Sequence, residues 1–460
     1  MRNSAPNAAP STHSPPWWEQ LAAGFVVIML TGAFVGPVFA PTQDETPVLR
    51  LVWIPVYAMI ATLFLMRLDR VIRAWPALVL VGLTVLLAFA SKWWSIDAAT
   101  TQRRVIALAI AGAFAVYLGS VFRGVALPRL LTLAGLVMAV GSLIFVLAFP
   151  AIGIHRDIND GLWRGLWYEK NQMGQVMVCV AVAAAAWLAS GDRRWRLPAV
   201  TLVLATFLMV MTQSKTSLLC LMLGFGIVGA IWAARQGGAV LGVFAVWGAV
   251  FTALAVGIGF ALEGPTILIA LGKDPSLTGR TDIWAALMEM VRERPWTGYG
   301  YAAFWTRESV PADIIQARTG WLVPSAHNGW IDLLIQVGWP GAALVGLIFL
   351  VAVASTLTRL RDDGLAEGGF GLAYIAIVIT LSLSESVLMH HQDLAWVMVL
   401  AVLTRGVMMR GYNPAVAVAH PGRAAYQTPS RIAALSGHGQ ARRSPVPVRP
   451  VARALSGSGR

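Results

Sequence analysis

The chain has 460 residues, of which 57% are hydrophobic and only 12% are charged, and its mean hydropathy is +0.68. Soluble proteins carry about 25% charged residues, so this composition excludes a soluble globular fold and indicates a polytopic membrane protein. The net charge of +13 is no sign of nucleic-acid binding, because the basic residues lie mainly in short loops and in the segment after Thr404.

About twelve apolar segments follow the N-terminus, each near the roughly 20 residues that a helix needs to cross a bilayer. The expected fold is all-α, with a transmembrane domain over residues 17–410 and one large loop, 262–327, between the ninth and tenth helices. Residues 1–16 and the basic tail 411–460 are expected to be disordered, because they are rich in Pro, Ser and Ala and lack an apolar period. The expected helices cover residues 18–40, 48–66, 75–90, 104–121, 129–149, 173–190, 197–212, 216–234, 239–261, 329–356, 369–386 and 394–410.

The distribution of arginine predicts the orientation of these helices. Alternate short loops carry arginine clusters, for example 67–73, 193–196 and 359–361, and such loops face the cytoplasm. Both termini are therefore expected in the cytoplasm, with the large loop on the outer side of the membrane. Cations on the predicted outer side oppose this insertion bias, which indicates that some of them have a function. They are Lys170, Lys215, Lys273, Arg280, Arg292, Arg294, Arg307 and Arg318.

A short helix is predicted within the large loop, over residues 281–294. Apolar residues recur there at helical spacing, Thr281 is a suitable N-cap, and Asp282 suits the positive end of the helix dipole. Arg292 and Arg294 fall at the opposite end, where cations are favourable, so the helix dipole alone explains them. The helix dipole does not explain Arg280, the arginine that precedes the helix, so Arg280 is the better candidate for a functional residue.

Arg280 stands just before the N-terminus of that helix, where a cation is mildly unfavourable. An anion bound there would be held both by the guanidinium group and by the free backbone N–H groups of the first turn. The structural alternatives are an ion pair with Asp282 or Asp274, or a solvated arginine in a loop. Arg280 is therefore a candidate anion-binding residue.

His327 stands where the large loop re-enters the membrane, just before the apolar run 331–353. A histidine at this place can accept and release a proton near neutral pH. The competing interpretation is an interfacial histidine followed by Asn328 as the cap of the next helix. The sequence Gly-Trp-Pro-Gly at 338–341 predicts a kink about three turns further on, which could open space beside that helix.

Two other outer segments place cations at the membrane surface. Lys170 and Asn171 lie at the outer end of the sixth helix, where ordinary interfacial anchoring is the alternative explanation. The tight polar turn 212–217 holds Lys215 at membrane depth, where it faces either lipid headgroups or a cavity. A cation inside the membrane indicates function.

No metal or nucleotide site is expected. The run 390–393, His-His-Gln-Asp, is the one candidate for a metal, but adjacent histidines point in different directions on a helix. Glu385 and Ser384 are polar residues near the end of a predicted helix and could line a cavity. The sequence contains no phosphate-binding loop and none of the common hydrolase motifs.

Taken in chain order, these motifs resemble the O-antigen ligase and polysaccharide polymerase family. The resemblance covers about residues 20–410 and includes a large outer loop between the ninth and tenth of twelve helices. It is closest to the exopolysaccharide polymerase branch, because of the Lys-Asn-x-x-Gly and Ser-Lys-Thr elements. The motifs are Lys170-Asn171-x-x-Gly174, Gln213-Ser214-Lys215-Thr216, Gly279-Arg280-x-x-x-Trp284, Pro295-x-x-Gly298-x-Gly300, His327-Asn328, Gln336-x-Gly338 and Gly341.

The resemblance implies a metal-independent glycosyltransferase of the bacterial inner membrane, which needs no cofactor and whose active site faces the periplasm. Its donor would be a glycan on undecaprenyl diphosphate, and its acceptor another lipid-linked repeat unit in a polymerase or lipid A-core in a ligase. Expected partners are membrane lipids, a chain-length regulator and a flippase, but not nucleic acid. Ligases often carry arginine at the position of Lys215, and the two cations bind diphosphate differently, so lysine favours the polymerase.

The resemblance also assigns roles to the candidate residues. His327 and Arg280 match the catalytic histidine and arginine of the family loop, and Lys215 matches its diphosphate-binding cation. Arg280 is expected to contact the diphosphate as well. The remaining candidates are Lys170 for the diphosphate and Asn328, Asn171 and Asp282 as supporting residues.

A transporter or flippase is the rival from another class, since it would also have about twelve helices. Such a protein would be expected to show internal repeats, interrupted helices and charges at the bilayer midplane. Here the polar candidates gather at the predicted outer edge instead, which favours an outward-facing enzyme. A passive scaffold is the third alternative, and it would give His327, Arg280 and Lys215 no common role.

Overall fold

The computed structural model describes residues 15–33, 47–156, 159–238, 280–320 and 323–408. The chain divides into two compact units, Met1–Met409 and Arg410–Arg460, and every described residue belongs to the first. Within the described ranges the backbone is helical, apart from loops and one isolated bridge between Ile154 and Trp163. The predicted all-α class is confirmed for these residues. The predicted helix 239–261, the predicted tail and nearly all of the N-terminal segment lie outside the described residues.

Helices occupy the other eleven predicted segments. Within the described residues, six helices are long and apolar enough to cross a membrane, and five shorter apolar helices accompany them. The total of twelve spans remains a prediction. The helices are α1 (Trp17–Leu30), α3 (Pro47–Met66), α4 (Leu68–Val71), α5 (Trp75–Ala90), α6 (Ala98–Val121), α7 (Ala126–Ala148), α8 (Pro150–Gly153), α9 (Lys170–Ala189), α10 (Arg196–Met211), Lys215–Gly238, α12 (Arg280–Glu293), α13 (Val310–Thr319), α14 (Gly329–Gly364), α15 (Phe370–Ser382) and α16 (Leu394–Val407).

Large apolar side chains cover the outside of these helices. Leu147 on α7, Val203 on α10 and Leu350 on α14 are 71%, 69% and 67% exposed. A soluble fold would not leave so many such residues in water, whereas lipid tails are a suitable solvent for them. The exposed apolar surface and the apolar helices agree with a multi-pass membrane protein.

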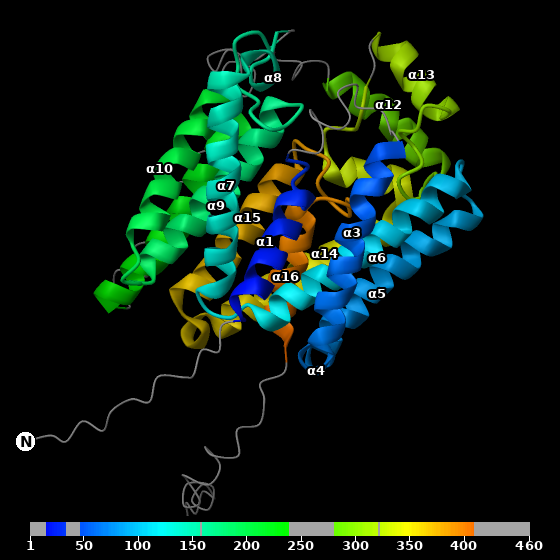
Figure 1. Ribbon diagram of the computed structural model, residues 1–460. Coiled ribbons are helices and arrows are strands. Elements are labelled where there is room, and N and C mark those ends of the chain that lie inside the picture. Colours follow the sequence, from blue (N-terminus) through cyan, green and yellow to red (C-terminus); the bar gives the residue numbers. More distant parts are fainter. Residues whose placement is uncertain (1–14, 34–46, 157–158, 239–279, 321–322, 409–460) are drawn as a thin grey trace, which may run out of the picture. The chain divides into compact units, whose positions relative to one another are not determined.

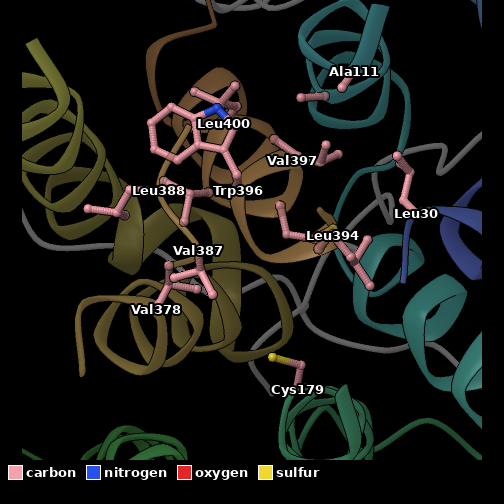
Figure 2. Packing of buried hydrophobic residues seen from close by; sticks show 14 of the residues in the cluster. Leu30, Ala111, Cys179, Val378, Val387, Leu388, Leu394, Trp396, Val397 and Leu400 are labelled. Atoms are coloured by element: carbon pink, nitrogen blue, oxygen red, sulfur yellow. The ribbon is translucent and has the colours of Figure 1, made fainter. Parts of the chain in front are cut away.

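The centre of the packing is α16. It packs against α6 and α14, while α9 packs against α7 and α10. Figure 2 shows side chains of α16, including the fully buried Trp396, between labelled residues of α1, α6, α9 and α15. In Figure 1, α8, α12 and α13 lie at one end of the helices and α4 lies at the opposite end. The segments that carry the candidate residues are thus held at one end of a well-packed helical core.

Helix α14 is broken at its tenth residue, Gly338, as the Gly-Trp-Pro-Gly sequence predicts. Gly338 has φ 67° and ψ −166°, a conformation essentially restricted to glycine. Pro340 lacks an N–H group, so it cannot donate to the carbonyl of Gln336 four residues earlier. The break therefore releases backbone groups that need new partners.

The segment 295–302 of the large loop supplies those partners. Tyr299 N donates to Ile335 O at 2.8 Å, and Gly300 N donates to Gln336 O at 3.0 Å. In return, Trp339 N donates to Pro295 O at 2.9 Å. The side-chain oxygen of Gln336 accepts a further bond from Ala302 N at 2.8 Å. The Pro-x-x-Gly-x-Gly and Gln-x-Gly motifs are therefore the two halves of one docking contact.

Gly338→Ala is expected to destabilise the protein by roughly 2–5 kcal/mol, through backbone strain and overpacking together. The added Cβ would lie 2.6 Å from Pro295 O, so the loop would have to move away from α14. Thermal unfolding of the purified protein in detergent measures the effect. The matched control is Gly346→Ala in the same helix, where no atom lies within 4 Å of the new Cβ. Equal unfolding temperatures for the two variants would contradict the prediction.

Candidate functional site

Three predicted site residues meet at one carboxylate, that of Glu385. Asn171 Nδ2 donates to Glu385 Oε1 at 3.2 Å, and Arg280 Nη2 lies 3.8 Å from the same oxygen. His327 Nδ1 lies 3.8 Å from the other oxygen, Oε2. These residues come from the start of α9, the start of α12, the residue pair before α14 and the segment after α15. The structure thus brings together segments that are far apart in the sequence.

Arg280 is held by the segment after α15, and no ion pair joins it to Asp282 within the described residues. Its Nη1 donates to Ser384 O at 2.8 Å, in addition to the contact with Glu385. The described part of α12 includes both Arg280 and Thr281, so Thr281 lies inside the helix and the prediction that it caps the helix is wrong. Asp282 is exposed on the first turn, and no contact joins it to Glu385 within the described residues. Asp274 lies outside the described residues.

His327 has φ 47°, the left-handed region, which few residues other than glycine adopt. Its backbone N–H donates to Ser325 Oγ at 3.3 Å, and the preceding carbonyl, Ala326 O, accepts from Trp284 Nε1 of α12 at 2.8 Å. Strained backbone of this kind persists only where surrounding contacts hold it, and it is common at functional sites. These contacts fix the imidazole of His327 beside α12.

Asn328 caps α14, as the competing interpretation of this segment expects. Its Oδ1 accepts from Trp330 N at 3.0 Å and from Ile331 N at 3.2 Å. Its Nδ2 donates to Leu383 O at 3.4 Å, so the same amide also joins α14 to the segment after α15. The cap is formed by Asn328 and not by His327, whose chemical role stays a prediction.

Lys215 and Lys170 lie beside this cluster. Lys215 begins the helix that follows α10, and its ammonium group acts electrostatically on that of Lys170. The next residue, Thr216, accepts a hydrogen bond at 3.4 Å from Ser384 Oγ, and the carbonyl of Ser384 holds Arg280. Ser384 therefore connects the predicted diphosphate-binding segments, and three cations gather at this end of the helices.

The glycine of the Lys-Asn-x-x-Gly motif, Gly174, allows the start of α9 to pack closely against the turn that carries Lys215. A Cβ on Gly174 would lie 2.6 Å from Ser217 Oγ and 3.2 Å from Ser214 Cβ. A larger residue would push the start of α9 away from the turn that carries Lys215. Asn171 and Lys170 would move with it, so the glycine sets the width of the site.

His155 is a residue of this region that the sequence did not single out. It is fully buried, and its Nε2 accepts from Lys170 N at 3.1 Å, which caps α9 in place of a side chain from residue 169. An imidazole nitrogen that accepts a hydrogen bond carries no proton. Glu169 Oε2 lies 4.0 Å from the same nitrogen. No motif marks His155, because it lies in a loop 15 residues before its partner.

The pair His390 and His391 stacks with ring centroids 4.9 Å apart. Burial holds the pKa of His391 well below its usual value, so this imidazole is neutral at pH 7. Throughout the part of the chain that the structure describes, no three His, Cys, Asp or Glu side chains gather where they could hold a metal ion.

Comparisons with known proteins point to one family. Residues 199–346 match the family model described as O-Antigen ligase, a range that runs from α10 into α14 and contains Lys215, Arg280 and His327. The chain is also similar to the "Exopolysaccharide production protein ExoQ" of Rhizobium meliloti (strain 1021), with 30% identity over 243 residues. That match covers 49% of this chain and 54% of the relative, so it spans about half the length of each. Over these residues the chain is therefore similar to the O-antigen ligase family and to an exopolysaccharide production protein, as its ordered motifs predict.

Proposed function

We propose that this protein is a membrane glycosyltransferase that polymerises oligosaccharide repeat units carried on undecaprenyl diphosphate, at the periplasmic face of the inner membrane. The observation that carries the proposal is the convergence of His327, Arg280 and Asn171 on Glu385, beside Lys215 and Lys170. A proton acceptor and several cations within one site suit the transfer of a group from a diphosphate.

In the proposed reaction, a hydroxyl oxygen of the acceptor glycan attacks the anomeric carbon of the donor. The bond between that carbon and the phosphate oxygen breaks, and its electrons leave with the undecaprenyl diphosphate. His327 takes the proton of the attacking hydroxyl. The reaction needs no nucleotide, because the bond to the diphosphate carries the required free energy.

The cations of the site have a matching role in this reaction. Negative charge grows on the phosphate oxygen as the sugar leaves, and preorganised cations stabilise that charge more in the transition state than in the ground state. Arg280 is held by Ser384 and Glu385, and Lys215 starts a helix whose positive dipole end also favours an anion. Lys170 adds a third positive charge.

A ligase that passes a finished glycan to lipid A-core is the second candidate, and the description of the family model favours it. The printed name of the relative, an exopolysaccharide production protein, favours the polymerase. The lysine at position 215 also favours the polymerase. Ligases often carry arginine there, which binds a phosphate through two parallel hydrogen bonds, and lysine cannot do this. We therefore prefer the polymerase.

Gel analysis of envelope glycans from a deletion strain tests the proposal, with both lipopolysaccharide and secreted polymer probed. Loss of polymer, with single repeat units on intact lipid A-core, is expected for a polymerase. Long polymer left on undecaprenyl diphosphate, with bare lipid A-core, would identify a ligase instead. Unchanged glycans, or repeat units trapped on the cytoplasmic face, would refute the proposal and favour a scaffold or a flippase.

A further inference from the structure

Glu385 belongs to no motif of the resemblance, yet three of the candidate site residues contact its carboxylate. Its two carboxylate oxygens face different partners. Oε1 receives Asn171 Nδ2 at 3.2 Å and faces Arg280 Nη2 at 3.8 Å, whereas Oε2 faces His327 Nδ1 at 3.8 Å. The side chains of Glu385, Arg280 and His327 are 16%, 22% and 23% exposed, so water screens these charges only partly.

The backbone around Glu385 is held rigidly at the end of α15. Glu385 N donates to Leu381 O at 2.8 Å, and Glu385 O accepts from Val387 N at 3.1 Å. The residues just before it are contacted by other segments of the site. Trp330 Nε1 donates to Ser382 Oγ, Asn328 Nδ2 to Leu383 O, Arg280 Nη1 to Ser384 O, and Ser384 Oγ to Thr216 Oγ1. These hydrogen bonds hold the backbone that carries the Glu385 carboxylate in a defined position.

We propose that Glu385 is a positioning residue of the transfer reaction: its charge favours the tautomer of the neutral imidazole that carries the proton on Nδ1 of His327, so that Nε2 carries the lone pair that accepts the proton of the attacking hydroxyl. This proposal rests on the proposed function. Nδ1 is buried, and Oε2 of Glu385 lies 3.8 Å from it, a distance for an electrostatic contact and not for a hydrogen bond. The carboxylate also stabilises the positive charge that His327 gains when it accepts the proton.

Glu385 acts through its neighbours and not on the substrate. Oε1 accepts the hydrogen bond of Asn171, and both oxygens face protein cations or donors, which suits a residue that positions its neighbours. Its negative charge also opposes the attraction of Arg280 for an anion. Removing the charge is therefore expected to slow the proton transfer while binding of the diphosphate donor stays at least as tight.

The test uses purified full-length protein and the lipid-linked oligosaccharide fraction extracted from the deletion strain. Glu385→Gln is expected to lower kcat about 10- to 100-fold, the range typical of residues that orient another ligand or base, without raising KM for the donor. Glu385→Asp keeps the charge and is expected to retain more activity than Glu385→Gln. Glu289→Gln, an exposed acid of α12 that pairs with Arg318, is the control and is expected to match the wild type.

A double-mutant cycle separates positioning from structural support. In a His327→Asn background, Glu385→Gln is expected to change the residual rate less than about threefold, because a residue that acts through His327 has nothing left to orient. Equal losses in both backgrounds, wild-type kcat in Glu385→Gln, or lower activity in Glu385→Asp than in Glu385→Gln would each overturn the proposal. An active His327→Asn variant would refute the proposed function itself, which is a different outcome.

Discussion

Replacing His327 with Asn is expected to lower polymer formation at least about 100-fold while the protein still folds, because general-base catalysis contributes about 10²–10⁴ to a rate. Asparagine adopts the left-handed backbone conformation readily, so it suits the φ of 47° at this position. An amide cannot accept the proton of an attacking hydroxyl. The variant therefore removes the chemistry and keeps the backbone, and polymer length and yield in a complemented deletion strain report the result.

His327→Ala is the companion variant, and it is expected to be equally inactive but less stable. Comparison of the two in thermal unfolding assigns any difference in stability to the backbone at position 327. Near-normal polymer from either variant, at protein levels matched by immunoblot, would remove His327 from the reaction. The same assay with an Asn328→Ala variant measures how much of any loss comes from the cap of α14, which is typically worth about 1 kcal/mol.

Arg280→Ala is expected to reduce transfer by about 10²–10³, the usual effect of removing one preorganised donor from a developing negative charge. The transfer rate of Arg280→Lys is expected to lie between those of the wild type and Arg280→Ala. An ammonium group keeps the charge, but it lacks the planar guanidinium that can bond to Ser384 O and to the diphosphate together. Initial rates on the extracted lipid-linked oligosaccharides measure both variants.

Arg318→Ala is the matched control for this change. It removes an arginine from the same large loop, and its exposed pair with Glu289, at 2.6 Å, is expected to matter little. Transfer rates in Arg318→Ala that fall as far as those in Arg280→Ala would mean that the total charge of the loop is important and not the position of Arg280. Full activity in Arg280→Ala would refute its assigned role.

The residue types and their order were sufficient to predict several members of the site. His327 and Arg280 were recognisable because each stands at the boundary of a predicted helix, where its chemistry is unusual, and the structure places both at one carboxylate. Asn171 is predicted only as a supporting residue of the site, and the structure shows that it contacts that same carboxylate. Asp282 was the weakest of these predictions, since the structure leaves it exposed on α12.

Glu385 could not be recognised as the meeting point from the sequence. An acid near the end of an apolar segment has many possible partners, and which of them it meets depends on how α9, α12, α14 and α15 pack. His155 is a similar case, because its imidazole caps a helix that begins 15 residues later. Contacts of this kind are set by tertiary packing and leave no local period or motif.

The fold could be predicted from the sequence more completely than the site, because the bilayer restricts the chain to apolar helices of a narrow range of lengths. The break in α14 was also predictable, since Gly-Trp-Pro-Gly cannot continue a regular helix. The segment that docks at this break could not be predicted. Nothing in the sequence pattern indicates that the N–H groups of Tyr299 and Gly300 donate to the carbonyls that the break releases. The predicted helix 239–261 falls outside the described residues, so the total of twelve remains a prediction.

The break at Gly338 also bears on how the protein is made. During synthesis α14 enters the membrane as a nascent segment, and lipid offers no hydrogen bonds to the carbonyls of Ile335 and Gln336. Segment 295–302 precedes α14 in the chain, so with the proposed outward orientation of the loop it can dock as soon as the helix arrives. Docking of this segment and insertion of α14 are therefore expected to be coupled, and the His327 end of the candidate site would be assembled in the same step.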